Sequence, residues 1–389
     1  MHIGIFTDSY LPYTSGVVRS IVTFSRELRN LGHQVSIFAP DYGSCRPEKD
    51  IYRFRSLRAP TFKEFALAIP FAPSLPRLLR QMGVELIHVH SPFLMGQLGA
   101  HMARRLGLPL VATYHTLYEE YVHYLPLAPH LMRRAVRHYT ISFCNRCQLI
   151  ITPTESVRAY LQQNNVRTPI TSIPTGIELE RFHNLDRGWL RRHLLLSPED
   201  IILLHVGRLG KEKNIAFILQ AFALVHQQAP ATHLVLVGSG PLKENLESQA
   251  RTLGISRAVT LAGSFPFEQM PAVYAGADLF IFASVTETQG LVIAEAHAAG
   301  LPVVAVRAYG VQEMVVDGSD GFLTPLDLPA FSAPVQQLVA DQERRQQMGR
   351  QARRNVTALA AAAMAQRLAE KYRELLSPPQ TSIPPLRPQ

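Results

Sequence analysis

Two glutamates, Glu287 and Glu295, are separated by seven residues where a predicted strand, 279–283, leads into a predicted apolar helix, 291–299. A carboxylate that faces an apolar environment without a partner is costly, so each side chain needs a hydroxyl or a cation to bind. The strand before the two glutamates and Gly290, which lies between them, make this pattern more specific than the spacing alone. We therefore interpret the two carboxylates as part of a ligand site.

Basic residues follow another predicted strand, 201–206, and lie where a helix begins at Asn214. Gly207 allows a ligand to approach closely, and Arg208 and Lys213 can neutralise the oxygens of a diphosphate at the helix N-terminus. The chain has no Gly-Lys-Ser or Gly-Lys-Thr sequence, which excludes a Walker loop. The alternative interpretation is a pair of solvated loop cations.

Short, almost continuously apolar segments alternate with helical patterns, which is typical of parallel sheets covered on both faces. The first half has predicted strands at 1–6, 34–39, 85–90, 108–114 and 149–152, with helices at 17–31 and 96–106. The second half has predicted strands at 201–206, 233–237, 259–261, 279–283 and 302–306, with helices at 214–228, 241–253, 266–275 and 291–299. Because the alternation of strands and helices begins again in the second half, the sequence predicts an α/β fold of two doubly wound, Rossmann-like domains.

The expected domains are residues 1–180 and 181–376, with a linker in 173–186 where Pro174 and Gly176 interrupt the pattern. An Ala-rich helix, 357–376, is assigned to the second domain. Residues 377–389 contain five prolines and are expected to form a flexible tail. Because ligands bind beyond the carboxyl ends of the strands in such sheets, we expect the site in the cleft between the domains.

Three motifs occur in an order that resembles the retaining glycosyltransferases of family 4, which have the GT-B fold. They are a glycine in the first loop, Gly16, then Arg208 with Lys213, then Glu287 with Glu295, and the resemblance covers roughly residues 1–375. Family members often have two glycines in the first loop, but Ser15 stands first here, so only Gly16 is carried over.

The resemblance implies a role for each motif in binding a nucleotide sugar in the second domain, while the first domain binds the acceptor. Glu295 would bind the ribose hydroxyls, and Glu287 the hydroxyls of the donor hexose. Arg208 and Lys213 would bind the diphosphate. Backbone amides at the helix start would face the sugar and phosphate, from Thr288, Gln289, Gly290, Leu291 and Val292.

Residues 113–124 carry a finer resemblance, because they read Thr-Tyr-His-Thr-Leu-Tyr-Glu-Glu-Tyr-Val-His-Tyr. This segment and Glu-Thr-Gln-Gly at 287–290 are similar to bacterial diacylglycerol glucosyltransferases. That similarity implies UDP-glucose as donor, diacylglycerol as lipid acceptor, and a hydrogen bond from His115 to the donor hexose beside the anomeric carbon. The catalytic set would be His115, Glu287, Arg208 and Lys213. Candidates for the acceptor side are Asp8, Tyr118, Glu119 and Tyr121.

The family is described as using a front-face route, in which the departing phosphate takes the proton of the acceptor hydroxyl. Arg208 and Lys213 would then stabilise the charge that develops on the leaving group. No Asp-x-Asp metal site is needed for this route. We therefore expect no essential metal, and no cofactor besides the nucleotide sugar as co-substrate.

Positive charge is concentrated in the first half of the chain. The whole chain has 39 Lys and Arg against 30 Asp and Glu, and residues 1–187 hold 21 of these basic and 13 of these acidic side chains. Such asymmetry indicates a polyanion, either nucleic acid or an anionic membrane surface. A lipid acceptor favours the membrane, and a solvated basic face is the alternative.

Two segments are candidates for that membrane contact. One is the apolar and basic stretch 62–80, and the other is a helix face with Arg133, Arg134, Arg137 and His138. The chain shows no secretory signal and no apolar run of about 18 residues. We therefore expect a cytoplasmic protein, peripherally associated with the inner face of the cell membrane, that binds no nucleic acid. The sequence favours no oligomeric state.

Alternative functions are a mannosyltransferase of the phosphatidylinositol type, a family 4 transferase with a soluble acceptor, and a non-catalytic nucleotide-sugar-binding protein. UDP and GDP both remain open as the donor nucleotide. A nicotinamide oxidoreductase is hardly supported, because Lys243 stands where the glycine fingerprint that starts at Gly238 needs its third glycine.

Two further pairs of residues have the spacing of metal or redox sites. Cys144 and Cys147 lack a second pair of ligands, and three cysteines imply no disulfide framework. His88 and His90 lie on one face of a predicted strand and would need further ligands to bind a metal. Of these two, His90 is expected nearer the cleft.

Overall fold

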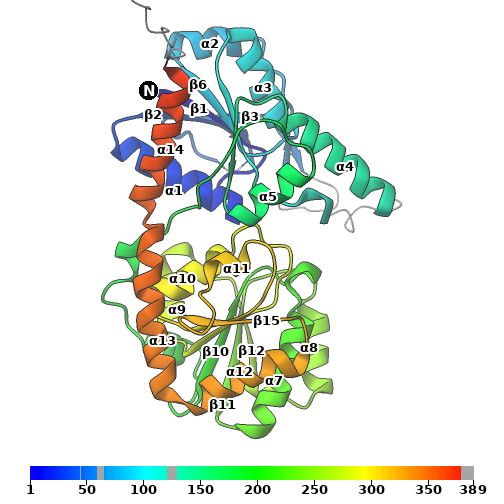
Figure 1. The fold of residues 1–389 in the computed structure, drawn as a ribbon, viewed down its shortest axis with the longest axis vertical. Helices are drawn as coiled ribbons and strands as arrows, with labels where there is room; N and C mark the ends of the chain where they lie inside the picture. Colours follow the sequence, from blue (N-terminus) through cyan, green and yellow to red (C-terminus); the bar gives the residue numbers. More distant parts are fainter. Residues whose placement is uncertain (44, 59–64, 121–128, 378–389) are drawn as a thin grey trace, which may run out of the picture.

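The computed structural model describes residues 1–389 except 44, 59–64, 121–128 and 378–389. It contains two α/β domains, with the N-terminus in the upper domain of Figure 1. Tyr121 and the expected tail from residue 378 onward lie outside the described residues.

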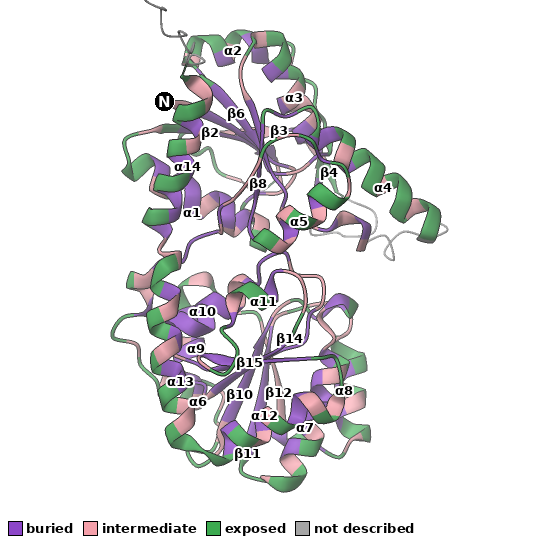
Figure 2. Ribbon diagram, in the orientation of Figure 1, coloured by how far each residue is buried: buried purple, intermediate pink, exposed green. Residues whose placement is uncertain are grey.

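The first domain is built on a parallel sheet with the strand order β3-β2-β1-β6-β7-β8-β9. Apolar cores lie on both faces of this sheet, which explains why its strands are so apolar (Figure 2). The strands are β1 (His2–Phe6), β2 (Gln34–Pro40), β3 (Ile51–Phe54), β6 (Leu86–Val89), β7 (Leu110–Thr113), β8 (Leu149–Thr152) and β9 (Ile170–Ser172). The helices are α1 (Gly16–Asn30), α2 (Leu75–Met82), α3 (Leu94–Leu106), α4 (Pro129–Cys144) and α5 (Glu155–Gln163), and β4 (Ser56–Arg58) pairs with β5 (Ala66–Ala68) in an antiparallel hairpin.

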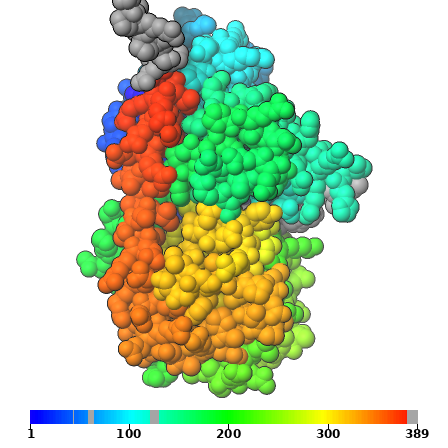
Figure 3. Space-filling model, viewed as in Figure 1, coloured from blue at the N-terminus to red at the C-terminus, as the bar shows by residue number. Residues whose placement is uncertain are grey.

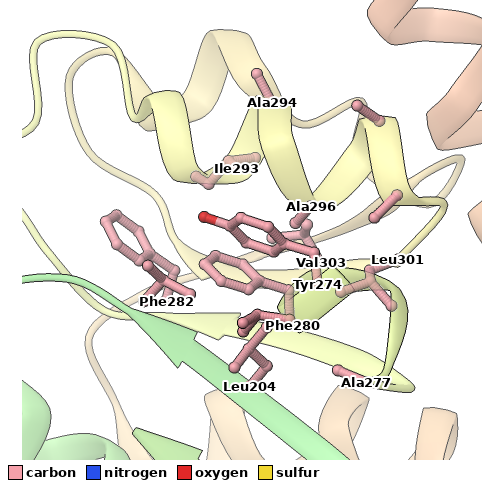
Figure 4. Packing of buried hydrophobic residues seen from close by; sticks show 14 of the residues in the cluster. Leu204, Tyr274, Ala277, Phe280, Phe282, Ile293, Ala294, Ala296, Leu301 and Val303 are labelled. Carbon is pink, nitrogen blue, oxygen red and sulfur yellow. The ribbon is translucent and has the colours of Figure 1, made fainter. Parts of the chain in front are cut away.

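The second domain repeats this design with the parallel order β12-β11-β10-β13-β14-β15. Its strands are β10 (Ile201–Val206), β11 (Thr232–Val237), β12 (Val259–Gly263), β13 (Leu279–Phe282), β14 (Val303–Val306) and β15 (Gly321–Thr324). Its helices are α6 (Trp189–His193), α7 (Ile215–Gln228), α8 (Lys243–Thr252), α9 (Met270–Ala275), α10 (Leu291–Ala299), α11 (Val311–Met314), α12 (Leu328–Ala340) and α13 (Gln342–Asn355). Figure 4 shows part of its core, where Tyr274 packs beside Phe280 and Ile293.

The strand order reverses once in each sheet, between β1 and β6 in the first and between β10 and β13 in the second. Loops diverge at such a point and leave a crevice at the carboxyl ends of the strands. Asp8 and His90 follow β1 and β6, and Gly207 and Glu287 follow β10 and β13. The predicted α/β fold of two Rossmann-like domains is confirmed.

The last helix, α14 (Ala361–Leu376), differs from its expected grouping with residues 181–376. Its apolar face completes a core of the first domain, because Leu368 and Tyr372 are buried beside α1 and β1. Figure 3 shows this red helix lying against the first domain. The chain therefore crosses between the domains twice, and the two crossings are joined where Ile177 N donates to Leu359 O at 2.7 Å and Ala361 N donates to Ile177 O at 3.0 Å.

Candidate active site between the domains

Lys213 and Glu287 meet at the carboxyl end of the second sheet. Nζ of Lys213 forms an ion pair with Oε1 of Glu287, which is half-buried in the loop between β13 and α10. Burial raises the pKa of Glu287, but the charge and hydrogen bond of Lys213 outweigh it and hold that pKa below its usual value. The site therefore offers an ionised carboxylate, which can accept hydrogen bonds from hydroxyl groups.

The loop after β10 packs closely against the loop after β11. A Cβ on Gly238 would lie 1.9 Å from the carbonyl oxygen of Gly207, and a Cβ on Gly240 would lie 2.5 Å from that of Leu209. Both glycines of the apparent dinucleotide fingerprint are thus explained by contact between two backbones. Arg208 is exposed in the first of these loops.

Glu295 is only 3% exposed and lies on α10, at a pocket between the domains. Its Oε2 accepts a hydrogen bond of 2.7 Å from the hydroxyl of Tyr274, in the same domain. Its Oε1 forms an ion pair with Arg19, which reaches across from α1 of the first domain. The pocket is lined by Arg19, Thr23, Thr175, Gly176, Ile177, Glu178, Arg181, Phe182, Phe267, Leu291 and Glu295.

Thr288 and Gln289 use their side chains to join the two domains. The hydroxyl of Thr288 donates to the backbone oxygen of His115 at 2.6 Å, and the hydroxyl of Thr154 donates to Thr288 O at 2.7 Å. The amide of Gln289 bonds both N and O of Thr175 at 2.9 Å. The donor role expected for these residues concerns their backbone amides and stays a prediction.

The start of α10 faces the start of α1 across the cleft. Gly290 has φ +86, a left-handed conformation that favours glycine, and α10 begins directly after it. A Cβ on Gly16 would lie 4.0 Å from Leu291, so these two predicted donor-site residues are brought together. Val292 follows on α10 and is half-buried.

His115 is half-buried directly beyond β7, at the cleft edge of the first sheet. Its Nε2 lies 2.8 Å from Nδ1 of His90. Burial lowers the pKa of His115 to about 3, so the imidazole is neutral at pH 7. A neutral imidazole can offer one hydrogen-bond donor or one acceptor to a ligand in the cleft.

Two residues predicted for the acceptor side, Asp8 and Tyr118, lie close enough for the charge of Asp8 to raise the pKa of Tyr118 further. Asp8 accepts from the hydroxyl of Ser91 and, at 2.9 Å, from the backbone of Met95, so it holds the start of α3. Burial raises the pKa of Asp8 and of Tyr118, and the ring of Tyr118 lies edge-on to Phe93 at 5.0 Å.

Glu119, also predicted for the acceptor side, lies under α4. Its carboxylate is 1% exposed and 3.4 Å from Nε of Arg137, and burial raises its pKa. Arg133 also pairs with an acidic side chain, that of Glu120, at 3.0 Å. Two arginines of the predicted basic face are thus partly neutralised, whereas Arg134 is exposed and has no ion pair within the described ranges.

The two residue pairs that have the spacing of metal or redox sites, Cys144 with Cys147 and His88 with His90, are buried in the first domain. Cys144 and Cys147 are buried free thiols, and burial raises the pKa of Cys144 to about 12. His88 bonds the hydroxyls of Tyr372 and Thr113 at 2.6 and 2.7 Å. In the part of the chain that the structure describes, no three His, Cys, Asp or Glu side chains are grouped as a metal site requires.

Three residues at the cleft were missed by the sequence analysis: Arg19, Tyr274 and Thr175. Arg19 lies one turn after Gly16 on α1, so the helical period could have placed both on one face. Tyr274 is an ordinary core tyrosine by its sequence surroundings, and Thr175 lies in the expected linker. Neither residue stands in a sequence pattern that indicates a ligand site.

Comparison with known proteins supports a transferase site. Residues 14–181 match the model described as Glycosyltransferase Family 4, and residues 186–355 match that of Glycosyl transferases group 1. Alpha-monoglucosyldiacylglycerol synthase of Streptococcus pneumoniae is 36% identical over 320 residues, which are 78% of this chain and 71% of that protein. The enzyme of the same name from Acholeplasma laidlawii is 30% identical over 335 residues, 82% of this chain and 84% of its own.

Solved structures share the fold at lower identity. The HepE protein of Anabaena, solved with UDP and glucose, has a TM-score of 0.78 at 20% identity, covering 96% of this chain and 100% of its own. Sucrose-phosphate synthase from Thermosynechococcus elongatus has a TM-score of 0.79 at 23% identity, covering 96% of this chain and 98% of its own. The chain therefore belongs to family 4 of the glycosyltransferases, and it has the GT-B arrangement of two Rossmann-like domains around a cleft.

Proposed function

We propose that this glycosyltransferase moves a hexose, with retention, from UDP-glucose to diacylglycerol or a similar lipid at a membrane surface. The observation that carries the proposal is the similarity, over most of the chain, to two proteins named alpha-monoglucosyldiacylglycerol synthase. The likeness in fold to a protein solved with UDP and glucose is in keeping with this donor.

The cleft offers a group for each part of the donor. Glu287, kept ionised by Lys213, accepts hydrogen bonds from hexose hydroxyls, and Glu295 accepts from the ribose hydroxyls. Arg208 and Lys213 stabilise the diphosphate as it departs. The bond from the anomeric carbon to phosphate breaks, the acceptor oxygen bonds to the same face of that carbon, and the acceptor proton passes to the departing phosphate.

Exposed apolar side chains of the first domain support a lipid surface as the place of reaction. Leu57 is 65% exposed, Phe71 78% and Leu131 74%, on the β4 hairpin, the segment before α2 and the start of α4. Arg134 and His138 are exposed on the same helix as Leu131. The apolar side chains would enter the interface while the cations meet anionic headgroups on the cytoplasmic face of the cell membrane.

The part of the stretch 62–80 that spans 62–64 lies outside the described residues. No helix within the described ranges is long and apolar enough to cross a bilayer.

A panel of donors tested with diacylglycerol vesicles examines the proposal directly. UDP-glucose should give a glucolipid, and NMR of the product should show an α linkage, as retention of an α-linked donor requires. A Glu287→Gln variant is the matched control and should lose most of the turnover. Transfer only to water-soluble acceptors, or a β-linked product, would overturn the proposal.

A mannosyl transfer is the second candidate. The GDP-mannose-dependent alpha-mannosyltransferase of Corynebacterium glutamicum is 28% identical over 338 residues, 85% of this chain and 78% of its own. The same panel therefore includes GDP-mannose, and phosphatidylinositol beside diacylglycerol. Faster transfer from GDP-mannose would favour this candidate.

A further inference from the structure

The rings of His88, His90 and His115 lie in a row between α14 and the cleft. His88 is held by Tyr372 and Thr113, and its ring centroid lies 4.3 Å from that of His90. Nδ1 of His90 lies 2.8 Å from Nε2 of His115, with the two rings nearly parallel at 19°. His90 is 1% exposed, whereas its neighbour His115 is half-buried at the edge of the cleft.

The hydrogen bond between His90 and His115 contains a single proton. Burial lowers the pKa of His115 to about 3 and that of His90 well below its usual value, so both imidazoles are neutral at pH 7. A neutral imidazole carries one N–H and one bare nitrogen. Either His90 donates and His115 accepts, or the reverse.

The second nitrogen of His90 decides the direction. Nε2 is buried and has no hydrogen-bond partner among the described residues. If His115 donated, His90 would carry its own proton on Nε2 and leave a buried N–H without an acceptor. If His90 donates, only a bare lone pair is left unpaired. Buried N–H groups without a partner are the rarer of the two, so the structure favours His90 as the donor.

We propose that His90 is a positioning residue, which keeps His115 in the tautomer protonated on Nδ1. His115 then presents a fixed N–H donor to the cleft, suited to an oxygen of the donor hexose rather than to a hydroxyl proton. This step rests on the proposed function only in naming the hexose as the ligand. The tautomer itself is a property of the protein without substrate.

The first test therefore needs no activity. In the full-length protein labelled with ¹⁵N-histidine, long-range ¹H–¹⁵N spectra distinguish protonated from bare ring nitrogens, and His115→Gln assigns the signals of His115. We expect a protonated Nδ1 and a bare Nε2 for both His90 and His115. A protonated Nε2 on His115, or a mixture of tautomers, would overturn the inference whatever the enzyme transfers.

The second test uses two substitutions that place an amide at different ring positions. In His90→Asn the amide nitrogen can occupy the place of Nδ1, whereas in His90→Gln it reaches toward the place of Nε2 and fills more of the buried volume. We expect His90→Asn to keep kcat within about threefold of the native value and His90→Gln to lose about tenfold, the size of one hydrogen bond. KM for the donor should change less than kcat in both.

A purely structural role for His90 predicts the opposite order, because Asn leaves the larger cavity. Thermal unfolding of both variants is measured alongside kcat, and a kcat that follows stability would contradict the positioning role. If no acceptor is found and kcat cannot be measured, the tautomer in the spectra still decides the inference. The failure of the proposed function is thus separate from that of His90.

Discussion

Glu295→Gln tests the ribose site with little change in side-chain shape. In the protein without ligand the carboxylate already has two partners, Arg19 on Oε1 and Tyr274 on Oε2. The side chain of Arg19 is 31% exposed and lies on the other domain, whereas Tyr274 is fully buried. We therefore expect a ribose hydroxyl to replace Arg19 rather than Tyr274.

The size of the effect follows from this exchange. A hydrogen bond to a charged group contributes about 1.5–3 kcal/mol, and losing a partly exposed ion pair offsets up to about 1 kcal/mol of it. The difference of about 0.5–2 kcal/mol corresponds to UDP binding that is about 2- to 30-fold weaker in Glu295→Gln. Removing the competitor, in Arg19→Ala, should tighten UDP binding by up to about fivefold.

Isothermal titration of UDP into the native protein, each single variant and the double variant measures the coupling. Arg19→Ala should have no effect in the Glu295→Gln background, because the competition acts through the carboxylate. An unchanged dissociation constant in a folded Glu295→Gln variant would refute the ribose assignment. Equal effects of Arg19→Ala in both backgrounds would refute the competition.

Three other changes have expected outcomes. In Lys213→Met the two largest effects that lower the pKa of Glu287 are lost, while burial still raises it and Ser284 and His205 oppose burial only in part. The pKa of Glu287 therefore rises, and the acid limb of the kcat–pH profile moves to higher pH. A limb that stays in place would show that this carboxylate does not control turnover. Binding to anionic vesicles should weaken as salt is added, since charges are screened over about 8 Å at physiological ionic strength. Arg134→Ala should weaken this binding by about 1 kcal/mol, which is more than the effect of Arg133→Ala, because Arg133 is already paired with Glu120. A sedimentation assay in which both variants bind alike would contradict this ranking. Leu368→Ala should lower the free energy of unfolding by about 2–5 kcal/mol, as measured in urea, because this side chain of α14 is only 1% exposed. A change of less than about 0.5 kcal/mol would show that α14 contributes little to the core of the first domain.

Buried elements of the second domain were predicted most closely from the sequence. The bounds of β10 (Ile201–Val206) and α10 (Leu291–Ala299) agree with the predicted ranges, because each is a mostly apolar run that is followed directly by a glycine. The edge strand β3 and the β4–β5 pair were missed, because β3 and β4 mix arginine with apolar side chains and all three strands are too short to show a clear period.

Contacts between the domains could not be predicted from the sequence. The pairing of Arg19 with Glu295 and that of Gln289 with Thr175 depend on how two separately folded sheets face each other. No local pattern encodes that placement. For the same reason the amphipathic pattern of α14 predicts a buried face but not which domain covers it.

The return of α14 has a consequence for how the protein is made. A ribosome completes the seven strands of the first sheet early, yet Leu368 and Tyr372 are translated only after the whole second domain. Until then part of the apolar surface around α1 stays uncovered, which exposes the nascent chain to aggregation. The first domain is thus expected to depend on chaperones longest, although its strands emerge first.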